Sequence, residues 1–380
     1  MKKIGIILFC VDIFTSCSAA LSGCQTNRLP EISDGCQFNN PKTEITLMVM
    51  KKFINKPEDI TKELLEGFTL AYQEQVKLVS EKIVVRAKPK EKDKVAVITL
   101  GGAGHEPALI GFVGKGMLDA AVVGDIFAAP GAPKVLEALR LFKDHPAIVL
   151  VILNHAGDVM NGNLAYNMAV KEGINVRKIL TAEDIAPGLD APVEERRGLG
   201  GCIPLIKVAG TAAEKGHNID EVLNVAEKFN QSMATLAVTM KTATHPQSGQ
   251  YISELPDDMM EIGMGQHGEG GGTGPQKILT ADETAEVMVK KLITAIKLQT
   301  GDKATLIING SGATTLMEQF IVFRKAHQIL SQLGVQLIHC RCGELLTVQE
   351  AAGFQMFLAK FDEQTLSHYT ATCSTPYWTT

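Results

Sequence analysis

Short apolar runs that end in glycine loops are the feature that most constrains how this chain can fold. Residues 147–153 are entirely apolar, and residues 94–100 form a β-branched run that leads into Gly101. Such runs suit strands that are buried on both faces of a sheet. Residues 133–143 and 164–171 follow with helical spacing. This alternation is typical of an α/β protein whose parallel sheet is covered by helices.

The second half of the chain repeats the alternation. A capping-box sequence at residues 280–283 predicts the start of a helix. Residues 305–308 read as a strand that enters a Gly-Ser-Gly loop, and a helix follows over about 315–333. Because 380 residues exceed what one hydrophobic core usually organises, we predict two α/β domains, each a sheet flanked by helices. Their expected ranges are 50–230 and 231–380, with the C-terminal segment packing back on the first domain.

Residues 1–49 differ from the rest of the chain. A basic start, an apolar run and Leu-Ser-Gly-Cys at residues 21–24 are the parts of a secretory or lipoprotein signal. Asp12 interrupts that apolar run. The alternative is that translation starts at Met50 and that residues 1–49 are a disordered extension or a start-site artefact. We favour this alternative, and with it a cytoplasmic protein.

Composition excludes several classes of function. The chain has 37 basic and 42 acidic residues, no dense Lys/Arg block, one Trp and five Tyr, so nucleic acid is not expected as a direct ligand. Four of the eight cysteines lie within the first 36 residues, and none lies between Cys36 and Cys202. This distribution does not fit a secreted disulfide framework and indicates reduced intracellular thiols.

Three glycine-bounded loops carry candidate chemistry. Residues 101–107 read Gly-Gly-Ala-Gly-His-Glu-Pro after a strand, and deliver His105 to the carboxyl end where open α/β sheets bind ligands. Residues 154–158 bring Asp158 to a second strand end. Residues 263–274 contain His267 and a formal match to the dinucleotide fingerprint, but neither a buried strand before it nor a helix directly after it. The alternatives are a structural histidine at His105 and a turn-forming aspartate at Asp158.

Two histidines and an aspartate on separate loops suit proton transfer on a small polar substrate. No zinc ligand set or Ser-His-Asp arrangement is recognisable, and Cys340 and Cys342 read as ordinary thiols. We therefore predict no metal site on this chain. Six histidines have no comparable context, and surface or internally satisfied positions are the default for them: His145, His155, His217, His245, His327 and His368.

From Met50 onward the chain resembles the substrate-binding subunit of the dihydroxyacetone kinase family. The resemblance rests on ordered motifs over about 330 residues: Met50-Lys-Lys-Phe-Ile-Asn, Gly101-Gly-Ala-Gly-His-Glu-Pro107, Gly114-Lys-Gly-Met-Leu118, Gly157-Asp-Val-Met-Asn161, Arg196-Arg-Gly198, Met264-Gly-Gln-His-Gly-Glu269, Asn309-Gly-Ser-Gly-Ala-Thr-Thr-Leu316 and Thr375-Pro376. It implies two α/β domains, usually paired as a homodimer, with the substrate between loops of both.

The resemblance also implies roles for the loop residues. His267 matches the family's histidine that adds to the ketone of dihydroxyacetone as a covalent hemiaminal, and a neutral imidazole is a suitable nucleophile. Asp158 matches the base for the terminal hydroxyl that attacks phosphorus, and His105 the second acid/base residue. Backbone contacts to the substrate are expected from residues 102–104, which are Gly102, Ala103 and Gly104.

Four positions depart from the family's usual pattern. Leu100 and Ala103 replace a Gly and a Ser, Leu153 stands where many members carry a Lys, and Gln266 stands where a β-branched apolar residue is common. The loss of a charge-assisted hydrogen bond costs about 1.5–3 kcal/mol if nothing replaces it. The pattern fits another small ketose, such as erythrulose, as well as dihydroxyacetone.

No Walker A loop, kinase Gly-rich loop or Asp cluster for a Mg-nucleotide is recognisable. The resemblance therefore implies no cofactor on this chain. It implies a helical partner subunit that carries either Mg-ATP or Mg-ADP, and in the second case a phosphocarrier of the phosphoenolpyruvate phosphotransferase system recharges the ADP. No membrane association is expected. The competing class is a ketose sensor that assists a transcription factor. Retention of His105 and Asp158 favours an enzyme, because a sensor needs only His267.

Overall fold

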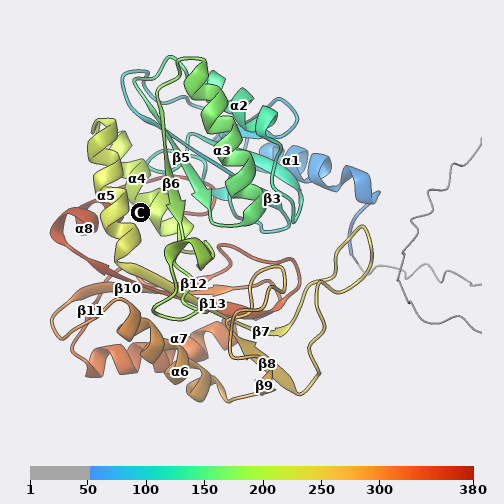
Figure 1. Ribbon diagram of the computed structural model, residues 1–380, viewed down its shortest axis with the longest axis vertical. Coiled ribbons are helices and arrows are strands. Elements are labelled where there is room, and N and C mark those ends of the chain that lie inside the picture. The colour runs from blue at the N-terminus through green and yellow to red at the C-terminus, as the bar shows by residue number, and fades with distance from the viewer. Residues whose placement is uncertain (1–51) are drawn as a thin grey trace, which may run out of the picture. The chain divides into compact units, whose positions relative to one another are not determined.

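A computed structural model describes residues 52–380. The predictions made for residues 1–49 lie outside the described residues. Helices and strands alternate through most of the described chain, as predicted (Figure 1).

The first sheet has six strands in the order β1-β2-β4-β3-β5-β6. Strands β3 to β6 run parallel to one another, as the apolar runs predict, and β1 and β2 add an antiparallel edge. In β5, alternate residues enter two different cores, so the strand is buried on both faces and carries no polar residue. The strands are β1 (Val76–Val79), β2 (Ile83–Arg86), β3 (Ala96–Ala103), β4 (Ala120–Ile126), β5 (Ile148–Leu153) and β6 (Val176–Thr181).

Helices cover both faces of the first sheet. One face packs against α2 (Ala132–Leu141) and α3 (Ala156–Lys171). The other packs against α4 (Cys202–Glu214) and α5 (Ile219–Gln231), while α1 (Ile60–Ala71) contributes Leu65 to the same core. The small residues of α4 permit the close packing expected of them, since a Cβ on Gly210 would lie 2.4 Å from the Met117 Cα.

The second sheet has seven strands, and its topology differs from the prediction. The order is β11-β10-β13-β7-β8-β9, with β12 also paired to β10. The expected repeat of a parallel sheet is wrong, because β10, β13, β7, β8 and β9 pair antiparallel. Apolar strands predict burial but not direction. The strands are β7 (Met233–Lys241), β8 (Met259–Ile262), β9 (Gln276–Lys277), β10 (Lys303–Gly310), β11 (Gln336–Leu337), β12 (Arg341–Gly343) and β13 (Ala352–Phe361).

The sheets and helices form a layered body in which a helical layer lies between the two sheets. One face of the second sheet packs against α6 (Ala281–Ala295) and α7 (Leu316–Gln332). Its other face shares a core with α4, α5 and the first sheet, as Figure 1 shows. The C-terminal residues, including α8 (Glu363–Tyr369) and Trp378, join this shared core, and α8 packs on α4 and α5.

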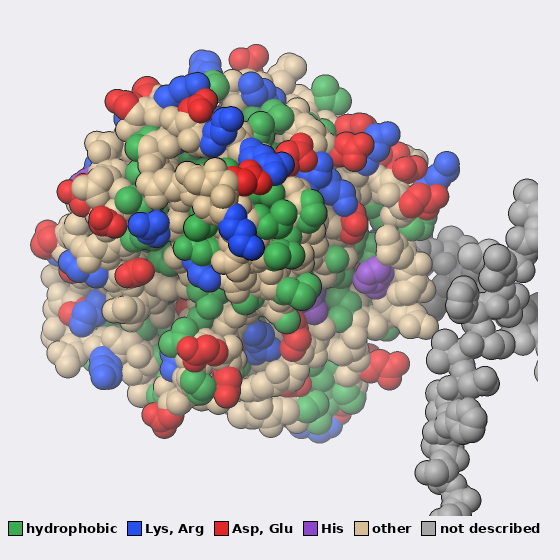
Figure 2. Space-filling view, turned by 45° about the horizontal axis from the view of Figure 1, so that its top comes forward, with side chains coloured by type: hydrophobic (Ala, Val, Ile, Leu, Met, Phe, Trp, Pro, Cys, Tyr) green, Lys and Arg blue, Asp and Glu red, His purple; other side chains and the backbone are tan. Residues whose placement is uncertain are grey.

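The surface carries charges of both signs. Figure 2 shows Lys and Arg side chains mixed with Asp and Glu side chains over this face, rather than gathered in one basic patch. Within residues 52–380 no helix combines the length and the apolar character needed to cross a membrane.

Candidate active site

The three predicted loop residues converge on one cavity, although they lie far apart in the sequence. His105 follows β3, Asp158 lies in the first turn of α3, and His267 lies in the loop between β8 and β9. The empty volume is about 410 Å³, including the part that opens to solvent. The lining residues are Gly101, Gly102, His105, Ala108, Leu109, Phe127, Ala128, Ala129, Leu153, His155, Asp158, Gln266, His267 and Leu346.

The first predicted loop begins later than expected. Strand β3 continues through Gly101 and Gly102 to Ala103. A Cβ at position 102 would lie 2.8 Å from the Ala128 nitrogen, so the close approach of these two backbones requires glycine there. Gly102 lines the cavity, whereas Ala103 is buried and Gly104 donates its N–H to the Glu106 carboxylate.

The second predicted loop is helical. We expected Asp158 in a loop before a helix at residue 164, but α3 already begins at Ala156. His155 is the N-cap residue of α3, so the helix starts directly beyond β5. The continuation of the helix through Gly157 and Asp158 fixes Asp158 on a rigid element at the edge of the cavity.

His105 is held by the second half of the molecule. Its Nδ1 lies 2.7 Å from the Thr347 carbonyl oxygen, so Nδ1 carries the hydrogen and Nε2 has the lone pair in the neutral ring. The Thr347 N–H in turn donates to the His105 carbonyl. Burial, together with the neighbouring His267, lowers the pKa of His105 to about 3, so the isolated ring is neutral at physiological pH.

His267 is oriented by Glu269. The His267 Nδ1 lies 3.0 Å from Glu269 Oε1, and its backbone N–H donates to Oε2 of the same carboxylate over 2.9 Å. Burial tends to raise the pKa of Glu269, but the hydrogen bonds and charge of His267 outweigh it and hold this pKa at about 2. A carboxylate at Nδ1 leaves the lone pair of Nε2 free to act as a nucleophile.

The two nucleophilic nitrogens face each other. His105 Nε2 and His267 Nε2 are 3.2 Å apart. Since both Nδ1 atoms face acceptors, two neutral rings would bring two lone pairs together. One additional proton, shared between the two Nε2 atoms, satisfies the contact. The pair can therefore offer both a nucleophile and a proton to a carbonyl placed beside it.

Asp158 is the third group at the cavity. Burial raises its pKa to about 7, and the charge of His267 opposes this shift. Its Oδ1 is buried without a hydrogen-bond partner among the described residues. A carboxyl with a pKa near neutrality and a free oxygen in a cavity is suited to general base catalysis.

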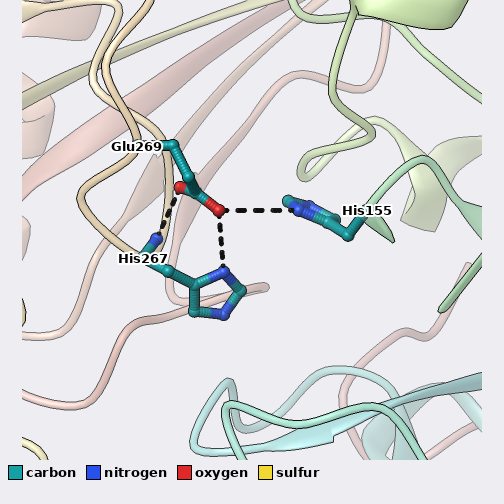
Figure 3. A group of neighbouring side chains, drawn as sticks. All are labelled: His155, His267 and Glu269. Carbon is teal, nitrogen blue, oxygen red and sulfur yellow. Dashed lines mark hydrogen bonds and ion pairs between the residues drawn. The ribbon is translucent and has the colours of Figure 1, made fainter. Parts of the chain in front are cut away.

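Sequence reasoning missed His155, which had been assigned to the histidines without a context. Its ring lines the cavity, and its Nδ1 lies 3.8 Å from Glu269 Oε1 (Figure 3). The Nε2 donates to the Gly198 carbonyl over 2.8 Å. Burial, and then the neighbouring His267, lowers the pKa of His155. The only sequence signal was its place directly after a buried strand.

Arg197 and Phe127 were also missed. The Arg197 guanidinium donates to Asp184 Oδ2, the Gly263 carbonyl and the Glu269 carbonyl at 2.7, 2.7 and 2.9 Å, and so ties the loop of His267 to the first half of the molecule. The ring of Phe127 packs against the rings of His105 and His267, with centroids 5.3 and 5.6 Å away. Arg197 lies in the motif Arg196-Arg-Gly198, which could have pointed to it, whereas no pattern in the sequence singled out Phe127.

Two of the four positions that depart from the family pattern lie at the cavity. Leu153 and Gln266 line it directly, and Ala103 is buried in the strand behind it. The Gln266 Nε2 is buried without a partner among residues 52–380. A leucine where a cation is common makes this side of the cavity apolar and changes what it can recognise.

Comparisons with known proteins show the family to which the chain belongs. Residues 66–377 match the family model described as the Dak1 domain. The dihydroxyacetone-binding subunit DhaK of PTS-dependent dihydroxyacetone kinase 1 from Listeria innocua is 34% identical over 315 residues, which are 83% of this chain and 95% of that protein. The L-erythrulose kinase of Pectobacterium atrosepticum is 33% identical over 86% of this chain, but only 56% of its own length is matched.

A solved structure matches as well. It is described as the dihydroxyacetone kinase operon co-activator Dha-DhaQ, with a TM-score of 0.79 and 30% identity, and the match covers 84% of this chain and 98% of the other. The fold, with two sheets flanked by helices, is thus the one predicted. The chain belongs to the Dak1 domain family, which the dihydroxyacetone-binding subunits of dihydroxyacetone kinases share.

Proposed function

We propose that this chain is the ketose-binding subunit of a dihydroxyacetone kinase, and that His267 holds the substrate as a covalent hemiaminal. The observation that carries the proposal is the convergence of His105, Asp158 and His267 on one small cavity, with the Nδ1 of each histidine occupied and each Nε2 directed at the other. The similarity to dihydroxyacetone-binding subunits supports the same substrate class.

The geometry is compatible with the proposed covalent step. The Nε2 lone pair of His267 forms a bond to the carbonyl carbon, the π electrons of C=O move to oxygen, and this oxygen takes the proton shared with His105. The positive charge then lies on the alkylated imidazole ring, where the Glu269 carboxylate at Nδ1 stabilises it. Glycerol has no carbonyl and is excluded by chemistry rather than by shape.

Asp158 is the base in the second step. With the carbonyl carbon fixed on His267, a terminal hydroxyl within reach of the free Oδ1 of Asp158 transfers its proton there as its oxygen attacks phosphorus. The phosphoryl group comes from a separate helical subunit that carries either Mg-ATP or Mg-ADP. In the second case a phosphocarrier subunit of the phosphoenolpyruvate phosphotransferase system recharges the ADP before the transfer. We propose that this assembly acts in the cytoplasm and that the ketose-binding chain is a homodimer.

The Asp158→Asn variant tests the proposal. With dihydroxyacetone labelled at the carbonyl carbon, NMR should show the adduct in both the wild type and the variant, because the nucleophile is intact. When the nucleotide-bearing subunit and its phosphate donor are added, the variant should form no phosphorylated product. Asp144→Asn, at an exposed position, is the matched control and should retain activity. Full turnover by Asp158→Asn would refute the role of Asp158.

Two alternatives draw on specific observations. The apolar Leu153 in the cavity and the similarity to L-erythrulose kinase favour a four-carbon ketose, which competition between dihydroxyacetone and both erythrulose enantiomers would reveal. The similarity to the DhaQ co-activator favours a ketose sensor. A sensor would form the adduct but would support no phosphorylation with any nucleotide-bearing subunit.

A further inference from the structure

Three potential metal ligands meet beside the cavity. One ring nitrogen each of His155 and His267 and a carboxylate oxygen of Glu269 all lie within 4.8 Å of one another. Both Nδ1 atoms face Glu269 Oε1, and Figure 3 shows the carboxylate between the two rings. His155 comes from the N-cap of α3, whereas His267 and Glu269 come from the loop between β8 and β9. The cluster therefore joins the two halves of the molecule.

The lone pairs of this cluster point inward. His155 uses its Nε2–H to donate to the Gly198 carbonyl, so Nδ1 carries the lone pair and faces Glu269 Oε1. A histidine whose second nitrogen donates to a backbone carbonyl is the usual arrangement of a metal ligand. A bare nitrogen and a carboxylate oxygen 3.8 Å apart, with no hydrogen between them, leave room for a cation.

Among residues 52–380 no Lys or Arg forms an ion pair with the Glu269 carboxylate. Arg197 is nearby, but its guanidinium is committed to Asp184 and to the carbonyls of Gly263 and Glu269. Within residues 52–380 the cluster is also the only group of three or more His, Cys, Asp or Glu side chains placed to hold a metal ion.

We propose that His155, His267 and Glu269 bind a divalent transition metal ion, with Zn²⁺ the best fit, and that this ion switches off the nucleophile. Zn²⁺ binds two histidines and a carboxylate at about 2.0–2.2 Å in a tetrahedron, which places ligand atoms roughly 3.3–3.6 Å apart. The observed separations of 3.0 and 3.8 Å bracket that range. The fourth position is left for water. The metal site stands on its own geometry, whereas its inhibitory effect rests on the proposed function.

The inhibition follows from a change in which nitrogen of the His267 ring carries the hydrogen. A neutral imidazole has one N–H, and in the free site it lies on Nδ1 of His267, facing Glu269. A metal ion on Nδ1 moves this proton to Nε2, so the lone pair that would attack the ketone is lost. The new Nε2–H donates to Nε2 of His105 at 3.2 Å, which satisfies the contact without an additional proton.

Zinc titration of the full chain tests the metal site. The wild type and His155→Ala are titrated near neutral pH against a chromophoric chelator, and the variant should lose one equivalent of Zn²⁺ or bind it at least tenfold more weakly. His327→Ala, which removes an exposed histidine of α7, is the matched control and should bind like the wild type. Because the chain has eight cysteines, only the difference between variants is interpreted.

Glu269→Gln gives a second, near-isosteric test. It should lose the same equivalent while circular dichroism shows an unchanged fold. Equal zinc binding by the wild type, His155→Ala and Glu269→Gln would overturn the proposal.

The ketose adduct supplies the second readout. Zn²⁺ should abolish the adduct of the wild type, and EDTA should restore it. Because His155 lines the cavity, His155→Ala is compared with itself: whatever adduct it forms without Zn²⁺ should be unchanged at the same Zn²⁺ concentration. Loss of the adduct in both proteins would place the inhibitory zinc elsewhere and contradict the proposal. If the wild type forms no adduct even without Zn²⁺, the proposed function fails, while the titration still decides whether the metal site exists.

Discussion

The two histidines at the cavity are held in opposite ways. His105 is buried, and a neutral backbone carbonyl fixes its Nδ1. The His267 side chain is 26% exposed, lies in a glycine-rich loop and depends on a carboxylate. In the proposed function this difference suits the first ring to exchange a proton and the second to form a bond, because a carboxylate would stabilise the positive charge of an alkylated ring. The buried ring has no such partner.

Removing the two histidine side chains one at a time should have the largest effects on the adduct. We expect His267→Ala to abolish the covalent adduct, since no other histidine that lines the cavity has a carboxylate hydrogen-bonded to its Nδ1. His105→Ala should weaken the adduct by roughly ten- to a hundredfold, the value of a hydrogen bond to a charged group. NMR with carbonyl-labelled dihydroxyacetone measures both. An adduct that survives in His267→Ala would show that the bond forms elsewhere.

Arg197 tests how the loop of His267 is attached to the first half of the molecule. Arg197→Ala leaves the buried carboxylate of Asp184 unpaired, so we expect a loss of about 3–5 kcal/mol in the free energy of unfolding. Urea unfolding measures it. Arg196→Ala is the control, since it removes only hydrogen bonds to the Ala191 and Leu189 carbonyls and should cost about 1 kcal/mol. Equal losses would mean that the loop does not depend on Arg197.

The pH dependence of the free energy of unfolding tests the burial of His105 and Asp158, the two cavity groups that come from the first half of the chain. The folded pKa of His105 is about 3, below its ordinary 6.5, so its contribution to stability is lost as pH falls from 6.5 toward 3. The folded pKa of Asp158 is about 7, above 3.8, so its contribution is present at low pH and lost as pH rises from 3.8 to 7. Between about pH 4 and 6.5 the two slopes oppose each other.

Single substitutions should separate the contributions of His105 and Asp158 to the change of stability with pH. On acidification from pH 6.5 to 4.5, His105→Gln should lose less stability than the wild type, and Asp158→Asn should lose more. Each difference is at most about 1.4 kcal/mol per pH unit. Denaturant midpoints at several pH values measure the differences. Identical pH profiles for the three proteins would contradict the burial of these groups.

The order of helices and strands was largely predictable because burial and helix capping produce patterns among neighbouring residues. The apolar run of β5 and the capping boxes of α6 and α7 each involve residues close together in the sequence. Strand direction is not local, so the antiparallel pairing of the second sheet escaped prediction. The start of α3 was also missed, because the polar and glycine residues at 154–158 read as a loop although the helix begins within them.

By itself the sequence determined which residues are candidates for the site: His105, Asp158 and His267 stand out because glycine loops present them beside buried strands. Only the tertiary structure decided what each can do. The contact between His105 and His267 joins residues 162 positions apart, and the cluster of His155 with Glu269 spans more than a hundred. A histidine's tautomer depends on what lies beyond each ring nitrogen, and the packing of the two halves supplies those partners.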